Sequence, residues 1–313
     1  MKKICIFLLG MLLVSSSFFV ACSKKKDDGK FDVICTVFPA YDWVVEVVGD
    51  NKDNFDLDML LDSGADLHSY QPSIQDIAKI ASCDMFIYVG GESDAWVSDV
   101  LAQKKNKDMI VINLMEVLEN DSGVVSVSDE HHDHTDEHLW LSLKHAVKFC
   151  NKIADEIGRL DTANEQVYKA NASAYIEELE TLDSDYVSAV DSAETKTMLF
   201  GDRFPFHYLF EDYGLTHFAA FSGCSAESES SFETITNLAA KIDELNLKYI
   251  IVLESSDKEV AKTIRNATQN KNQEILVIDS IQSVTSAKVN EGVKYLDIMK
   301  SNLNVLKTAL GVV

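Results

Sequence analysis

The chain has 313 residues and a formal net charge of −23 at pH 7, with 51 acidic residues against 28 lysines and arginines. This balance argues against a nucleic-acid partner, because phosphate binding draws on basic surface, whereas a negative field attracts cations. The length is too great for one compact core and sufficient for two lobes.

A short apolar leader opens the chain. Two lysines precede an apolar run over residues 4–20, which ends in Ala21-Cys22. The run is shorter than the roughly 20 residues of a membrane-spanning helix, and a small residue stands before the cysteine. Residues 1–21 are therefore predicted to be a signal peptide.

The stretch Phe19-Val20-Ala21-Cys22 resembles a bacterial lipobox, except that leucine is usual at the position of Phe19. The resemblance implies that Cys22 is lipidated and that the protein is anchored on the outer side of the cytoplasmic membrane, at the cell surface or in the periplasm. Residues 22–30 offer little to bury and are expected to form a flexible tether. The alternative is an ordinary cysteine beside a simple cleavage site.

Apolar runs alternate with helical segments from residue 31 onwards. The strand-like runs are 31–38, 55–61, 85–89 and 109–113, and helical spacing marks 40–48 and 74–80. This alternation predicts a parallel sheet flanked by helices. We expect it to form an N-terminal α/β lobe over residues 31–158.

No strand signal and no proline occur between about residues 145 and 193. An apolar stripe recurs there at spacings of three and four residues, which indicates one buried helix face: Tyr168, Ala172, Tyr175, Leu179, Leu182, Tyr186 and Val190. About thirty residues of helix would span roughly 45 Å, longer than a single lobe is wide. We therefore expect residues 159–192 to form a rigid linking helix.

The alternation resumes beyond this helix. Strands are predicted at 197–201, 218–221, 249–253 and 275–278, and helices at 205–212, 231–245 and 293–310. They define a C-terminal lobe over residues 193–313. The predicted fold class is α/β, with two similar parallel-sheet lobes joined by one long rigid helix.

The segment Asp129–His138, DEHHDHTDEH, holds four of the eight histidines between acidic residues. Imidazole and carboxylate groups suit zinc and related ions. Because the segment has no hydrophobic residues, we expect a flexible histidine-rich loop over 121–137 that collects ions weakly. The alternative is a solvated loop without function.

Two histidines lie where the chain returns to regular structure. His138 precedes the apolar Leu139-Trp140-Leu141, and His68 lies in a polar turn after the strand predicted at 55–61. Ligands of parallel α/β sheets bind beyond the carboxyl ends of the strands, so His68 is suitably placed. Taken alone, either histidine is more often a surface or capping residue than a ligand.

Several segments in order carry a family resemblance: GADLHSYQPSIQDI at 64–77, the histidine-rich stretch, DEHLWLS at 136–142, FPFHYLFEDYGL at 204–215, CSAESESSFETI at 224–235 and IDS at 278–280. Together they resemble the metal-binding lipoproteins of zinc and manganese ABC importers, the cluster A-I or ZnuA-like family. The resemblance implies a monomeric receptor that captures Zn²⁺, or else Mn²⁺, between two lobes. It also implies delivery to the membrane permease of an ABC importer, with no enzymatic activity.

The same resemblance implies that His68, His138 and Asp279 are metal ligands. Relatives usually have a histidine or glutamate where this chain has Arg203, which stays protonated and cannot coordinate. His207 lies one helical turn further on, and helical side chains lean towards the N-terminus, so its imidazole is the candidate fourth ligand.

Two alternatives to His207 remain open. One is that Asp202, at the end of the preceding predicted strand, is the fourth ligand. The other is that a water is the fourth ligand while Arg203 pairs with Asp202 or Asp279. A third imidazole favours zinc, whereas a second carboxylate favours manganese. Glu227, Glu229 and Glu254 are candidates for carboxylates that orient the ligating histidines, although each is more often a solvated charge or a cap.

Two other functional classes compete with a receptor. An open fourth position would suit the catalytic zinc of a hydrolase, yet the chain has no HExxH, GxSxG or phosphate-loop motif. A metal-stabilised adhesin lipoprotein is the other alternative. The mature cysteines Cys35, Cys83, Cys150 and Cys224 form no CxxC pair, and their disulfide state stays open.

Overall fold

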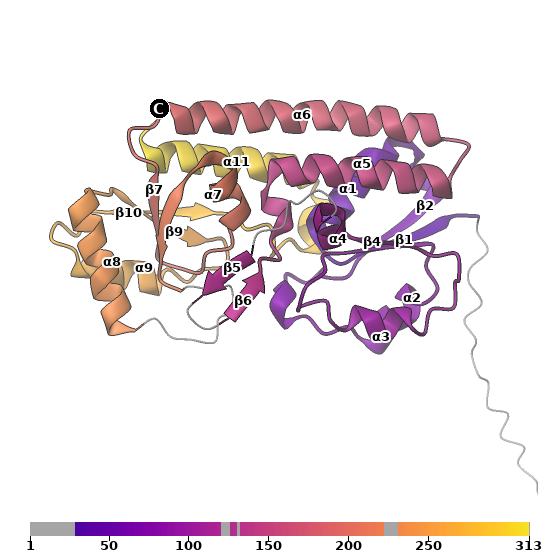
Figure 1. Ribbon diagram of the computed structural model, residues 1–313, viewed down its shortest axis with the longest axis horizontal. Coiled ribbons are helices and arrows are strands. Elements are labelled where there is room, and N and C mark those ends of the chain that lie inside the picture. Colours follow the sequence, from indigo (N-terminus) through magenta and orange to yellow (C-terminus); the bar gives the residue numbers. More distant parts are fainter. Residues whose placement is uncertain (1–28, 120–125, 130–131, 222–230, 313) are drawn as a thin grey trace, which may run out of the picture.

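Two α/β lobes lie side by side in the computed structural model, with one long helix running along both (Figure 1). The structure describes residues 29–119, 126–129, 132–221 and 231–312. The predicted signal peptide, the lipobox with Cys22 and most of the tether therefore lie outside the described residues. So do Cys224, Glu227 and Glu229.

The N-terminal lobe contains a parallel four-stranded sheet of order β2-β1-β3-β4. Its strands are β1 (Phe31–Cys35), β2 (Phe55–Met59), β3 (Met85–Tyr88) and β4 (Ile110–Asn113). Its helices are α1 (Phe38–Val48), α2 (Ile74–Ile80), α3 (Val97–Leu101) and α4 (Leu114–Glu119), with short 3₁₀ turns η1 (Gly49–Asn54) and η2 (Leu67–Ser69). Ser73 begins α2 with a capping box, in which its hydroxyl accepts from the amide of Asp76 and Asp76 accepts from the amide of Ser73.

The C-terminal lobe repeats this plan. Its strands β7 (Thr197–Phe200), β8 (Thr216–Ala219), β9 (Tyr249–Leu253) and β10 (Glu274–Ile278) form a parallel sheet of order β10-β9-β7-β8. Its helices are α7 (His207–Tyr213), α8 (Phe232–Leu245), α9 (Glu259–Ala267), α10 (Ser286–Asn290) and α11 (Tyr295–Leu310). Counted within each lobe, both sheets have the strand order 2-1-3-4, so the predicted pair of similar parallel-sheet lobes is confirmed.

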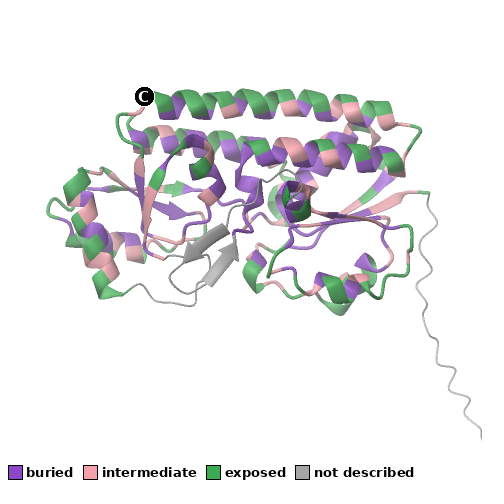
Figure 2. Cartoon of the chain, viewed as in Figure 1, coloured by how far each residue is buried: buried purple, intermediate pink, exposed green. Residues whose placement is uncertain are grey.

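Two long helices lie next to each other on one side of the molecule, and only the second runs along both lobes (Figure 1). After the 3₁₀ turn η3 (Leu139–Leu141), α5 (Leu143–Leu160) runs along the N-terminal lobe, and α6 (Glu165–Asp191) returns beside it and continues over the C-terminal lobe. The predicted apolar stripe of α6 is buried at all seven positions. Its opposite face is largely exposed (Figure 2). The 27 residues of α6 cover both lobes because its rise of 1.5 Å per residue gives a rod of roughly 40 Å.

Part of the histidine-rich segment forms a ribbon. Strands β5 (Ser126–Asp129) and β6 (His132–Thr135) pair antiparallel, with Asp129 opposite His132. A loop without regular structure was expected here, because Asp129–His138 has no hydrophobic residues. A two-stranded ladder is made by backbone hydrogen bonds and needs no buried side chains, so composition did not reveal it.

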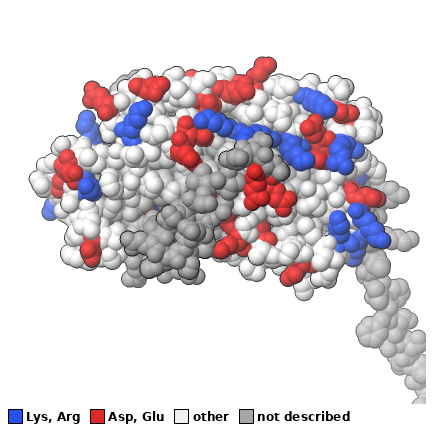
Figure 3. All heavy atoms as spheres, in the orientation of Figure 1, with Lys and Arg blue, Asp and Glu red and all other residues white. Residues whose placement is uncertain are grey.

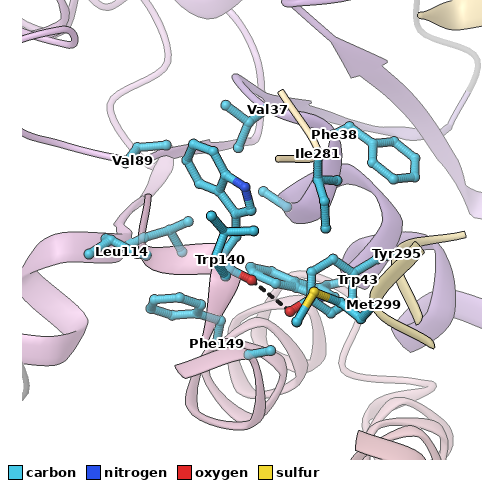
Figure 4. Close-up of a cluster of buried hydrophobic side chains, with 14 of the residues drawn as sticks. Val37, Phe38, Trp43, Val89, Leu114, Trp140, Phe149, Ile281, Tyr295 and Met299 are labelled. Atoms are coloured by element: carbon cyan, nitrogen blue, oxygen red, sulfur yellow. Dashed lines mark hydrogen bonds between the residues drawn. The ribbon is translucent and has the colours of Figure 1, made fainter. Parts of the chain in front are cut away.

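One continuous cluster of buried apolar side chains crosses from the first sheet to α11, rather than one core in each lobe. At its centre, Trp43 of α1 meets Phe149 of α5 and Tyr295 of α11, and Trp140 lies beside them (Figure 4). The hydroxyl of Tyr295 donates to the carbonyl of Trp140 at 2.6 Å. A separate, smaller cluster lies between the second sheet and the helices α8 and α9.

Acidic and basic side chains are interspersed over the visible face, with wide uncharged areas between them (Figure 3). In the described part of the chain, no helix is both long and apolar enough to cross a membrane. Cys35, Cys83 and Cys150 are buried, as small hydrophobic residues are, and none of the three forms a disulfide within the described residues.

Candidate metal centre

His68 is presented by a short turn that its neighbours hold in place. Leu67 is buried at the start of η2, and Asp66 caps the turn by accepting the amide of His68 on Oδ1 at 3.0 Å. The amide and the hydroxyl of Ser69 both donate to the carbonyl of Asp66. The His68 side chain, 27% exposed, therefore projects from an ordered turn.

His138 is held more rigidly, because it directly precedes the fully buried turn η3 and is itself 1% exposed. Asp136 accepts both the amide of His138, at 2.8 Å, and its Nδ1–H, at 2.6 Å, on the same oxygen, Oδ1. From the other lobe, the hydroxyl of Tyr208 donates to the carbonyl of Asp136 at 2.9 Å. The ring is thus fixed in orientation, with Nε2 as the nitrogen that could coordinate a metal.

Glu137, the residue between Asp136 and His138, lies against the ring of His68. Its Oε2 lies 3.4 Å from Nδ1 of His68, and its Oε1 accepts the amide of Ser93 at 2.9 Å. The hydroxyl of Ser93 lies 2.9 Å from the same Nδ1 of His68. Gly91 permits this approach, because its φ is +79° and a Cβ there would overlap the Glu137 carboxylate.

The two carboxylates remain charged although they are buried. Burial alone would raise the pKa of Asp136, but the charge and the hydrogen bonds of His138 outweigh it and hold that pKa below its ordinary value. Burial would also raise the pKa of Glu137, but hydrogen bonds from His68 and Ser93 outweigh that effect and lower the pKa. Each histidine thus has an ionised carboxylate at Nδ1, which raises the basicity of Nε2 as a metal ligand.

The separation of the two imidazoles fits a shared ion. Two imidazoles bound to one tetrahedral zinc, with Zn–N distances of about 2.0–2.1 Å, have ring centroids roughly 5 Å apart. The ring centroids of His68 and His138 are 5.2 Å apart, at an interplanar angle of 59°. The structure therefore brings these two predicted ligands together.

Asp279 follows β10, as predicted, in a loop tied to both lobes. Its Oδ1 accepts the amide of Ile281 at 2.7 Å, and the carbonyl of the next residue, Ser280, accepts from Nε1 of Trp140 at 2.9 Å. Burial, followed by the charge of Glu254, raises the pKa of Asp279 to about 6. Glu254 orients this loop rather than a histidine, because it accepts from the amide and the hydroxyl of Ser280 at 2.8 Å each.

Asp279 lines a hollow of about 400 Å³ between the loop after β10 and α11. The other lining residues are Val284, Lys288, Glu291, Gly292, Val293 and Ile298. Neither His68 nor His138 is among them.

His207 begins α7, where its ring meets the edges of two other rings. The centroid distance is 4.8 Å to Phe204 and 5.5 Å to His217. His217 itself stacks on Phe204. Asp202, the competing candidate, uses Oδ1 to accept the amide of Arg203 and Oδ2 to accept the amide of Leu253.

Arg203 does not pair with the side chain of Asp202 or with Asp279, as one alternative supposed, but reaches the other lobe. Its Nη1 donates to Oδ2 of Asp66 at 2.8 Å. Across residues 29–119, 126–129, 132–221 and 231–312, no three histidine, cysteine or acidic side chains gather in a group that could hold a metal ion. The structure thus assembles the pair His68 and His138, but not all four predicted ligands.

Three carboxylates that contact the predicted histidine ligands were not singled out from the sequence: Asp66, Asp136 and Glu137. Asp136 and Glu137 directly precede His138, so an acidic pair next to a candidate ligand was the available signal. The signal for Asp66 was weaker, because aspartate side chains commonly accept the backbone amide two residues further on in turns of every kind.

The chain is similar in sequence and in fold to known zinc-binding proteins. A family model described as the periplasmic zinc-uptake complex component A, ZnuA, matches residues 33–309. The zinc-binding lipoprotein AdcA of Streptococcus pneumoniae strain R6 is 31% identical over 315 residues, which cover 98% of this chain and 61% of AdcA. The chain thus spans about three fifths of that relative's length. The high-affinity zinc uptake system protein ZnuA of Bacillus subtilis is 28% identical over 317 residues, covering 96% of this chain and 97% of that protein.

Two solved structures share the fold over most of the chain. The Zn(II)-bound ZnuA-like domain of Streptococcus pneumoniae AdcA has a TM-score of 0.74 at 26% identity, covering 90% of this chain and 99% of that one. The metal-dependent lipoprotein YcdH from Bacillus subtilis has a TM-score of 0.75 at 28% identity, covering 91% and 100%.

Proposed function

Because the chain belongs to the ZnuA family of zinc-uptake components, we propose that it is an extracytoplasmic receptor that captures Zn²⁺ as its cargo. His68 and His138 bind the ion between the lobes, and the loaded protein delivers it to the membrane permease of an ABC importer. The protein acts as a monomer, held to the outer side of the membrane by a lipid on Cys22.

The observation that carries this proposal is the pair of carboxylate-backed imidazoles. His68 and His138 have ring centroids 5.2 Å apart, and Glu137 and Asp136 lie at their respective Nδ1 atoms. Imidazole suits zinc better than manganese, and such carboxylate–histidine pairs are common around zinc. The names of the AdcA and ZnuA relatives point to the same ion.

Asp279 and a fourth group complete the coordination when the ion enters. We assign the fourth position to His207, with Asp202 or a water as the alternatives. Loop displacements must bring these groups to the ion. His207 is the better donor, because both carboxylate oxygens of Asp202 already accept backbone amides.

Neither competing class is favoured by membership of this family. The receptor has no catalytic step to perform, so the chain is not assigned an enzymatic activity. An adhesin whose metal only stabilises the fold would leave zinc uptake unchanged on deletion of the gene, whereas a receptor would not.

The test replaces His68 and His138 together by alanine and follows zinc by calorimetry with a competing chelator. Tight binding should be lost while the circular dichroism spectrum is retained, because both histidines lie in turns outside the two sheets, although the ring of His138 packs against Trp140. A variant with His132 and His134 replaced by alanine is the matched control, and it should keep the tight site. Retained tight binding in the first variant would refute the site. Unchanged zinc uptake by cells lacking the protein would refute the transport role.

A further inference from the structure

We propose that Asp66 and Arg203 form an inter-lobe clasp that positions the His68 turn for the cargo ion, an inference that rests on the proposed function. Arg203 follows β7 in the C-terminal lobe, and Asp66 precedes the η2 turn in the N-terminal lobe. Their ion pair joins residues 137 positions apart in the chain.

Asp66 is the shared element of the clasp, because its two oxygens hold the two lobes. Oδ1 accepts the amide of His68 at 3.0 Å, and Oδ2 accepts Nη1 of Arg203 at 2.8 Å. A movement of Arg203 therefore acts on the carboxylate that caps the turn of His68.

The other end of the clasp is anchored in the second sheet. The amide of Arg203 donates to Oδ1 of Asp202 at 2.8 Å, and Oδ2 of Asp202 accepts the amide of Leu253, the last residue of β9. Phe204, the next residue, is 1% exposed. The guanidinium thus extends from a fixed backbone, and an unbroken series of contacts runs from β9 to His68.

For removal of Arg203, the clasp predicts a change in zinc affinity opposite in sign to simple electrostatics. If Arg203 acted only as a positive charge near a cation, its removal would tighten zinc binding, and removal of the Asp66 charge would weaken it. If the two residues position His68, loss of either partner weakens binding, and loss of both is no worse than loss of one.

The experiment measures zinc affinity by competitive calorimetry in Arg203→Gln, Asp66→Asn and the double variant. Asp66→Asn retains an oxygen for the amide of His68 but loses the ion pair. Arg203→Lys is the rescue, because it restores a charged donor. Lys294→Gln is the matched control, since it breaks the Lys294–Glu46 ion pair between the start of α11 and α1.

We expect each single variant to weaken zinc binding by about twofold to fivefold, the range for a partly exposed ion pair. The double variant should be no weaker than the worse single variant, Arg203→Lys should come within about twofold of the unmodified protein, and Lys294→Gln should not change. Tighter binding by Arg203→Gln, or additive losses in the double variant, would overturn the clasp.

A second readout needs no metal. In the zinc-free protein, amide hydrogen exchange of a peptide spanning residues 62–72 should accelerate in Arg203→Gln and Asp66→Asn but not in Lys294→Gln. Unchanged exchange in the first two variants would overturn the clasp even if zinc binds. An unmodified protein that binds no zinc would instead refute the proposed function, with the exchange measurement still deciding whether Arg203 holds the turn.

Discussion

Substitution of Asp136 tests the proposal that this carboxylate orients His138 as a metal ligand. Its Oδ1 accepts both the amide and the Nδ1–H of His138, and its side chain is 3% exposed. Asp136→Asn keeps a neutral oxygen in that place, so it removes the charge and preserves the geometry. Asp136→Ala removes the oxygen as well. The main-chain hydrogen bond from Tyr208 to Asp136 is available in both variants.

The expected losses follow from these two steps. Removal of a group that orients a ligating histidine typically costs about 10- to 100-fold in metal affinity, or about 1.4–2.7 kcal/mol. A hydrogen bond to an ionised acceptor is roughly twice as strong as a neutral one. We therefore expect a loss of about tenfold for Asp136→Asn and nearer 100-fold for Asp136→Ala.

The assay is zinc titration by calorimetry against a chelator, with the melting temperature of each metal-free variant measured alongside. Asp161→Asn is the control, because Asp161 accepts a hydrogen bond from Tyr168 at the turn between α5 and α6. It should leave zinc affinity unchanged. Zinc affinities of both Asp136 variants within about twofold of the unmodified protein would refute the reasoning, since a ligand oriented by this carboxylate cannot be indifferent to its loss.

Four further outcomes are expected. His207→Ala should weaken zinc by on the order of one to several kcal/mol and Asp202→Ala by less, as calorimetry will show; an unchanged affinity would withdraw His207 as a ligand. Replacing His132 and His134 by serine should lower the number of weakly bound ions in equilibrium dialysis without changing the tight site. Small-angle scattering with and without zinc should show only a modest change in lobe separation, because α6 and the shared core restrain the lobes. Burial raises the pKa of Asp42 to about 7, so the folded protein holds a proton that the unfolded chain releases from about pH 4 upwards, and stability falls as the pH rises between about 4 and 7. Asp42→Asn should flatten the melting temperature over that range, and an unaltered slope would contradict this.

The fold could be predicted where hydrophobic patterning was strong. The strand Tyr249–Leu253 was predicted with its observed bounds, because a continuous apolar run rich in β-branched residues is typical of a buried strand in a parallel sheet. The first strand was predicted to reach residue 38 but ends at Cys35. Pro39 lies in the first turn of α1, a position where proline is tolerated. The helices α3, α4, α9 and α10 were not predicted, since five to nine residues carry little periodicity.

The site was less accessible to sequence reasoning than the fold. His68 and His138 were singled out from their positions beside structured segments and from a family resemblance, not from any spacing that puts them together. The role of Glu137 depends on Ser93, 44 residues away, and on the missing side chain of Gly91. The pairing of Arg203 with Asp66 depends on how the lobes meet, which local patterns do not encode.

Because Trp43, Trp140 and Tyr295 share one buried cluster, the two halves of the chain are not interchangeable modules. In a chimera with one half taken from a relative only 31% identical, side chains would be mismatched throughout this shared cluster. Such a chimera should aggregate rather than fold. Substitutions in one half must therefore be matched by substitutions in the other as the family diverges. The portion that can be exchanged freely is the outer layer of α8 and α9, whose apolar contacts form a cluster of their own.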